Sequence, residues 1–153
     1  MIMNSTCICV VGLGYVGLPL AVEFSKHHRV IGFDIDGDRI KDLGNGMDKT
    51  GEVSSEVLGD AKGLSFTSDT SEIYDANIYI VTVPTPTDSN NNPVLTPLIK
   101  ASETVGGVLS RGNYIVYEST VFPGATEEIC IPVLEKESKL KLNEDFFVGY
   151  SPE

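Results

Sequence analysis

The chain has 153 residues, a length that suits one domain of ordinary size. Its 11 Lys and Arg residues against 22 Asp and Glu residues give a formal net charge of −11, which disfavours binding to nucleic acid or to an anionic membrane surface. Apolar residues make up 41% of the chain, enough for a core, yet no run reaches the roughly 18 residues that cross a bilayer, and residues 1–6 lack a signal-peptide pattern.

Strand-like and helix-like segments alternate along the chain. In chain order we expect strand 7–12, helix 15–27, strand 29–33, helix 36–43, a helical stretch near 55–58 within the glycine-rich segment 44–63, strand 64–67, helix 71–74, strand 77–83, helix 98–109, strand 113–117, helix 126–139 and strand 146–150. Pro19 falls in the first turn of its helix, where proline costs little, whereas Pro132 predicts a kink or break. The polar connection 84–97 is long enough to be functional or mobile.

This alternation predicts an α/β fold of the Rossmann type, with a doubly wound, mainly parallel sheet and helices on both faces. We expect residues 1–153 to form one domain. The chain stops at Ser151-Pro152-Glu153, directly after a predicted strand, where a complete domain would add a covering element. We therefore expect it to be a fragment of a longer protein.

The first strand-to-helix junction has the glycine pattern G-x-G-x-x-G. It reads Gly12-Leu13-Gly14-Tyr15-Val16-Gly17. We expect Gly12 to make the tight turn, Gly14 to let a pyrophosphate approach the backbone, and Gly17 to let the helix lie close to the strand. The N-terminus of that helix would then offer unpaired N–H groups to the phosphate oxygens.

A carboxylate follows the glycine loop at the spacing of a dinucleotide site. Asp34 lies 22 residues after Gly12, at the end of the second predicted strand. A carboxylate there accepts hydrogen bonds from the ribose hydroxyls of adenosine and repels a 2′-phosphate, which favours NAD over NADP. Arg39 weakens this preference, because it is placed either to meet a phosphate or to pack over the adenosine. It is equally consistent with a solvated charge on a helix.

The three later strands also end in polar sequences. In an open α/β sheet, ligands bind beyond the carboxyl ends of the strands, and in the dinucleotide-binding strand order these tips lie on the nicotinamide side. Thr85 and Thr120 are candidates to hydrogen-bond the cofactor or an ordered water, and Glu153 is a candidate general base. Hydroxyls at strand tips are also common turn formers, so a structural role stays open for each.

The cysteines indicate neither a disulfide framework nor a metal site. Cys7, Cys9 and Cys130 are odd in number and lack the C-x-x-C spacing. Cys7 and Cys9 are two residues apart in a predicted strand, so they would share one face. We interpret all three as buried structural thiols in a reducing cytoplasm.

Five short motifs follow one another along the chain. They are GLGYVGLP at 12–19, GFDI at 32–35, VPTP at 83–86, ESTV followed by PG within 118–124, and SPE at 151–153. Together they resemble the NAD-binding domain of the UDP-glucose/GDP-mannose dehydrogenase family over the whole chain. The version here is most similar to the bacterial UDP-N-acetylhexosamine 6-dehydrogenases, which make precursors of Vi-type or O-antigen polysaccharides.

The resemblance implies an oxidoreductase that converts the C6 hydroxyl of a nucleotide sugar to a carboxylate in two NAD-dependent steps. The residues it places at NAD are Gly12, Gly14, Tyr15, Val16, Gly17, Asp34, Arg39, Thr85 and Thr120. It implies that Tyr15 and Val16 contact the pyrophosphate through backbone N–H groups, and that Asp34 holds the adenosine ribose. It also implies that Thr120 positions a catalytic water and that Glu153 acts in base or water-orienting chemistry.

The resemblance also implies parts that this chain lacks. The family's catalytic cysteine, lysine and asparagine, its dimerising central helix and its UDP-binding domain lie further along, and Cys7, Cys9 and Cys130 do not match the cysteine motif. We therefore expect this chain to bind NAD without turnover. We expect the full-length protein to be a cytoplasmic homodimer that binds a UDP-sugar, and neither nucleic acid nor membrane.

Other interpretations remain open on the sequence alone. A non-catalytic nucleotide-sensing module with the same fold needs only the glycine loop and Asp34, and leaves Thr120 and Glu153 without a role. A UDP-glucose or GDP-mannose 6-dehydrogenase fits the same five motifs. An S-adenosylmethionine-binding methyltransferase domain is a third alternative.

Overall fold

The structure is a computed structural model that describes residues 6–119 and 124–151. Six strands form one sheet with the order β3-β2-β1-β4-β5-β6, and every pairing is parallel. The strands are β1 (Cys7–Val11), β2 (Arg29–Phe33), β3 (Leu64–Thr67), β4 (Ile78–Val81), β5 (Asn113–Tyr117) and β6 (Phe146–Tyr150). This is the doubly wound order whose two halves diverge between β1 and β4, so the predicted Rossmann-type α/β fold is confirmed.

The helices follow the predicted rhythm with shifted ends. They are α1 (Gly17–Ser25), α2 (Gly37–Gly44), α3 (Ser55–Asp60), the 3₁₀ turn η1 (Thr70–Glu72), α4 (Thr96–Val108), the π-helical turn η2 (Thr126–Cys130) and α5 (Ile131–Ser138). At Pro132 the helix does not break as expected: the π turn ends at Cys130 and α5 begins at Ile131 with both residues in helical conformation, so only the type of helix changes there. Helix α1 starts later than predicted, since Tyr15 and Val16 form a turn.

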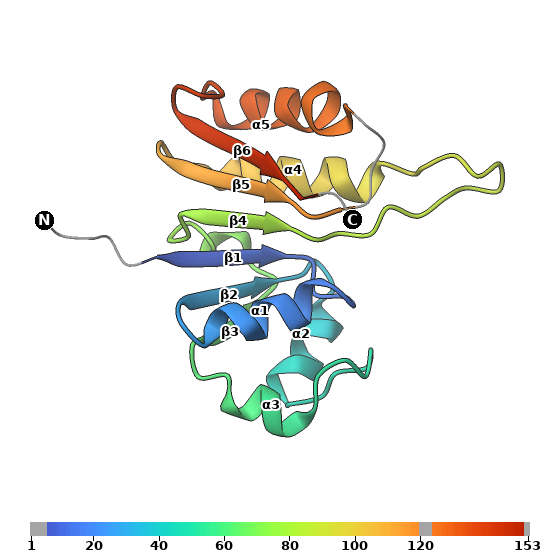
Figure 1. The fold of residues 1–153 in the computed structure, drawn as a ribbon, viewed down its shortest axis with the longest axis vertical. Coiled ribbons are helices and arrows are strands. Elements are labelled where there is room, and N and C mark those ends of the chain that lie inside the picture. Colours follow the sequence, from blue (N-terminus) through green and yellow to red (C-terminus); the bar gives the residue numbers. More distant parts are fainter. Residues whose placement is uncertain (1–5, 120–123, 152–153) are drawn as a thin grey trace, which may run out of the picture.

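Helices cover both faces of the sheet, as predicted (Figure 1). Strand β1 is buried along its whole length and its side chains alternate between two cores. Ile8 and Val10 pack with α1, α2 and α3, while Cys7 and Cys9 pack with α4 and α5. All three cysteines are buried, so the structural interpretation of the thiols and the shared face of Cys7 and Cys9 are confirmed.

The start of α1 lies unusually close to the end of β1. Gly12 has a φ of +99°, in the left-handed region that favours glycine, and its N–H donates to the Phe33 carbonyl at 2.8 Å. A Cβ on Gly17 would overlap the carbonyl oxygen of Gly12 and the hydroxyl of Thr82. The packing roles expected of Gly12 and Gly17 are therefore confirmed.

The connection between β4 and α4 projects beyond the sheet as a hairpin (Figure 1). Thr87 and Pro93 form an antiparallel bridge, and the Val94 N–H donates to the Pro86 carbonyl at 2.7 Å. At the tip, the Asp88 carboxylate accepts backbone N–H groups of two of the asparagines that follow it. The segment is thus internally hydrogen-bonded.

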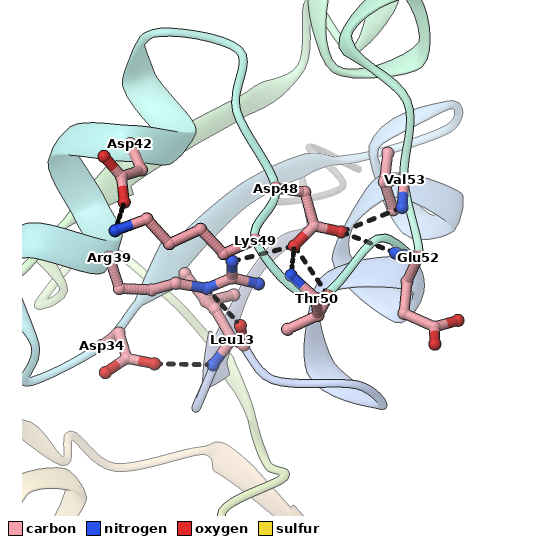
Figure 2. A network of polar contacts seen from close by, with 9 residues as sticks. All are labelled: Leu13, Asp34, Arg39, Asp42, Asp48, Lys49, Thr50, Glu52 and Val53. Carbon is pink, nitrogen blue, oxygen red and sulfur yellow. Dashed lines mark hydrogen bonds and ion pairs between the residues drawn. The ribbon is translucent and has the colours of Figure 1, made fainter.

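One carboxylate organises the glycine-rich connection between α2 and α3 (Figure 2). The Asp48 side chain has 0% exposure, and its Oδ1 accepts from Arg39 Nη1 at 2.8 Å and from the N–H and Oγ1 of Thr50. Its Oδ2 accepts from the N–H groups of Glu52 and Val53 at 3.0 and 2.9 Å. Burial alone would raise the pKa of Asp48, but hydrogen bonds from Thr50, Arg39 and Val53 outweigh it and hold this pKa well below its usual range.

We predict that Gly17→Ala destabilises the fold. The added methyl has to displace the Gly12 backbone, so the free energy of unfolding should fall by about 2 to 3 kcal/mol, measured by urea denaturation. Gly14→Ala is the matched control, because a Cβ there meets nothing within 4 Å. Its unfolding free energy should stay within about 0.5 kcal/mol of the wild type. An equal loss in both variants would contradict the close approach at Gly17.

We also predict that Asp48 makes stability depend on acidity. A carboxylate whose pKa is lowered on folding stabilises the protein fully above its unfolded pKa of about 4, and this stabilisation is lost as the pH falls below that value. The difference in unfolding free energy between the wild type and Asp48→Asn should therefore shrink as the pH is lowered below about 4. A difference that stays constant down to strong acid would show that the charge of Asp48 is unimportant.

Candidate functional site

Three neighbouring strands meet at the loop that joins β1 to α1. Strand β1 leads into Gly12, β2 is followed by Asp34, and β4 is followed by Thr82. The Thr82 hydroxyl is buried and donates to the Gly12 carbonyl at 2.6 Å, which ties the loop to the other half of the sheet. The loop therefore lies at the crossing point between the two halves, where open α/β sheets bind ligands.

The peptide units around Leu13 are held from both sides (Figure 2). The Leu13 N–H donates to Asp34 Oδ2 at 2.9 Å, and the Leu13 carbonyl accepts from Arg39 Nε at 2.9 Å. The other Asp34 oxygen accepts the N–H of Asp36 at 2.9 Å. Asp34 is half-buried, and each of its oxygens keeps a lone pair beyond the bond that orients it. The carboxylate is thus fixed in place and still able to accept from hydroxyl groups.

The turn before α1 offers hydrogen-bond donors. The carbonyls of Gly14 and Val16 accept the first helical bonds, from the N–H groups of Leu18 and Leu20. The N–H groups of Tyr15 and Val16 find no acceptor within residues 6–119 and 124–151. Because a Cβ on Gly14 would meet nothing within 4 Å, the space against this backbone is open. Unpaired donors at a helix N-terminus with open approach suit a diphosphate.

Arg39 lies on the first turn of α2, directly behind the loop. Its Nε contacts the Leu13 carbonyl and its Nη1 contacts Asp48, and the side chain is 11% exposed. Its Nη2 is buried and has no hydrogen-bond partner in the described part of the chain. The interpretation of Arg39 as a solvated helix charge is therefore wrong, because the guanidinium bridges two buried acceptors.

The far half of the site lies beyond β4, β5 and β6, whose adjacency follows the expected strand order. The Thr85 Oγ1 is buried without a hydrogen-bond partner among the described residues, and its contact with a cofactor stays a prediction. The Ser119 hydroxyl donates to the Val83 carbonyl at 3.0 Å and ties the tips of β5 and β4 together. Thr120 and Glu153 lie outside the described residues, so their roles stay predictions.

Two residues of the site were not predicted. The sequence pattern places Thr82 within a strand, whereas β4 ends at Val81. A hydroxyl that directly follows a buried β-branched run, at the edge of the sheet where ligands bind, would have indicated this residue. Asp48 lies in a segment with no periodicity and had no such signal.

Two absences among the described residues bear on the class of site. Within 6–119 and 124–151, no three His, Cys, Asp or Glu side chains are grouped so that they could hold a metal ion. No helix in the same ranges has both the length and the apolar character needed to cross a membrane.

The chain is similar to known dehydrogenases along its length. It is 58% identical over 151 residues to a UDP-N-acetyl-D-glucosamine 6-dehydrogenase of Pseudomonas aeruginosa, covering 99% of this chain and 36% of the relative. It is 57% identical over 146 residues to the enzyme of that name from Salmonella typhi, covering 95% and 34%. A solved UDP-D-ManNAc dehydrogenase from Pyrococcus horikoshii superposes with a TM-score of 0.90 at 33% identity, covering 97% of this chain and 36% of that one.

The chain thus spans about a third of the length of these relatives, 36% and 34% of the two sequences. Residues 6–153 match the family model described as the UDP-glucose/GDP-mannose dehydrogenase family, NAD binding domain. This match favours NAD over the S-adenosylmethionine alternative. From the match, the identities and the fold together, we conclude that the chain belongs to the UDP-glucose/GDP-mannose dehydrogenase family and constitutes its NAD-binding domain.

Proposed function

We propose that this chain is the cofactor-binding part of a UDP-N-acetyl-D-glucosamine 6-dehydrogenase, which oxidises the C6 hydroxyl of its sugar to a carboxylate in two NAD-dependent steps. The observation that supports the cofactor half is the pair of N–H groups at Tyr15 and Val16, which have no acceptor in 6–119 and 124–151 and lie beside an open Gly14 and an oriented Asp34. The choice of sugar is supported by the names of the relatives at 58% and 57% identity.

The described residues fit the adenosine diphosphate half of NAD. The diphosphate accepts from the N–H groups of Tyr15 and Val16, where the open approach at Gly14 leaves room for its oxygens. Asp34 accepts from the ribose hydroxyls, and its charge opposes a 2′-phosphate. Ile35 follows Asp34 and is 78% exposed, which gives an adenine ring an apolar surface.

At the other half of the site, the residues that follow β4, β5 and β6 face the reacting groups. When bound, NAD supplies the acceptor for the hydride removed from the sugar. The buried Thr85 hydroxyl, free of any described partner, hydrogen-bonds the cofactor. Thr120 contacts the cofactor and positions a water, and Glu153 acts as a base or orients that water.

The chain's own thiols do not supply a nucleophile. Cys7, Cys9 and Cys130 are buried, and burial raises the pKa of each thiol, which disfavours the reactive thiolate. The resemblance implies that the catalytic cysteine of the proposed reaction lies elsewhere in the full-length protein. A homodimeric assembly, a cytoplasmic location and a role in surface polysaccharide synthesis belong to the same proposal and rest on the resemblance.

We predict that Asp34→Ala weakens NAD binding about 10- to 100-fold, because a charge-assisted hydrogen bond to the ribose is lost. Isothermal titration calorimetry measures the affinity, and circular dichroism checks that the variant is folded. Asp75→Ala is the control, since it removes the same charge from a side chain that is 75% exposed. The ion pair of Asp75 with Arg29 is long, at 3.8 Å. Equal affinities for Asp34→Ala and the wild type would remove Asp34 from the site.

We also predict that the 153-residue chain binds NAD but does not reduce it with a UDP-sugar. The reason is the inert state of its three thiols. NADH absorbance with UDP-N-acetylglucosamine or UDP-N-acetylgalactosamine is the measurement. Sustained turnover by this chain alone would contradict the proposal that it binds the cofactor while the catalytic nucleophile lies elsewhere in the full-length protein.

A further inference from the structure

Arg39 conflicts with the proposed choice of NAD. In dinucleotide-binding domains of this fold, an arginine near the acidic residue after the second strand accommodates the 2′-phosphate of NADP. Arg39 follows Asp34 by five positions and contacts the loop residue that Asp34 also holds. The charge that NADP requires is thus present beside a carboxylate that opposes NADP. Any role for Arg39 in this choice rests on the proposed binding of NAD at the glycine loop.

The structure shows that this guanidinium is already engaged (Figure 2). Nε donates to the Leu13 carbonyl at 2.9 Å and Nη1 donates to Asp48 Oδ1 at 2.8 Å. The third nitrogen, Nη2, is buried from solvent. A phosphate that approaches from solvent therefore finds Nε and Nη1 already bonded to other acceptors and Nη2 buried.

Asp48 is anchored independently of the arginine. Four of its five hydrogen bonds come from its own segment, from the N–H and hydroxyl of Thr50 and the N–H groups of Glu52 and Val53. The carboxylate is fully buried, and the bonds from its own segment hold it in place independently of Arg39. Arg39 thus faces a fixed negative charge, and moving the guanidinium to a phosphate would leave that buried charge without its cation.

We propose that Asp48 is a specificity-determining residue of the cofactor site. By holding the Arg39 guanidinium against the Leu13 carbonyl, it withholds from a 2′-phosphate the positive charge nearest to Asp34, and so keeps the site selective for NAD. The same contact positions the glycine loop, because it fixes the Leu13 carbonyl on the side opposite to Asp34.

The neighbouring ion pair offers a matched control. Asp42 and Lys49 lie 2.8 Å apart, with side chains 22% and 68% exposed, and neither has a hydrogen bond to the glycine loop. Asp42→Asn removes the same unit of negative charge from the same region as Asp48→Asn. It therefore separates a general electrostatic effect on NADP from the release of Arg39.

The experiment measures the ratio of the NADP to the NAD dissociation constant by calorimetry, with competition titrations where NADP binds weakly. In Asp48→Asn this ratio should fall at least about five-fold, since one charge-assisted hydrogen bond to the phosphate becomes available. In Asp42→Asn it should stay within about two-fold of the wild type. In Asp48→Asn combined with Arg39→Met it should return to the value of Arg39→Met alone.

Two results would overturn the inference while leaving the proposed function intact. The first is a ratio of dissociation constants that Asp48→Asn does not change. The second is a fall in this ratio that is as large when Asp48→Asn is introduced into Arg39→Met as when it is introduced into the wild type. Failure of the wild-type chain to bind NAD would overturn both. If Asp48→Asn does not fold by circular dichroism, Asp48→Ser gives the same readout. Its hydroxyl can still accept the Thr50 N–H but is too short to reach Arg39. A purely structural role for Asp48 would weaken both cofactors equally and leave the ratio unchanged.

Discussion

The Leu13 residue of the glycine loop is fixed by two side chains of opposite charge. Asp34 takes its N–H and Arg39 takes its carbonyl, so the direction of the backbone that follows is set before any ligand arrives. The N–H groups of Tyr15 and Val16, which have no acceptor among the described residues, come within the next three residues. The direction of these N–H groups depends on the two hydrogen bonds of Leu13. It also depends on the close packing of α1 against the end of β1, which Gly17 allows. Preorganisation of this kind lowers the cost of ordering the site on binding.

A protein with a net charge of −11 has to bind a diphosphate without a favourable overall field. Charges beyond about 8 Å are largely screened at physiological salt, so the donors in direct contact decide the interaction. In the proposed site those donors are main-chain amides at a helix start, while the nearby cation, Arg39, is paired with Asp48. In such a site the diphosphate is recognised by main-chain N–H groups and the ribose by the Asp34 carboxylate, so no single charged side chain contacts both.

Local pattern was sufficient to predict most of the fold. Strands β2, β3, β5 and β6 have the bounds that the sequence predicted, and the observed strand order is the dinucleotide-binding one on which the placing of the later strand ends depended. Contacts between distant segments were not predictable in this way. The Thr82 hydroxyl meets Gly12 across 70 residues, and Asp48 acts from an irregular segment whose form its own side chain creates. The environment of Arg39 depended on that segment, so the sequence left several roles open for it.

The same carboxylate has a consequence for how the connection between α2 and α3 resists cleavage. Lys49 and Gly51 are exposed in a segment without regular secondary structure, which is where proteases usually act. A protease must draw several residues into an extended strand, and here that would strip Asp48 of its bonds to Thr50, Glu52 and Val53. Cleavage of the peptide bond after Lys49 by trypsin therefore costs these hydrogen bonds, a cost that the exposure of Lys49 alone does not reveal.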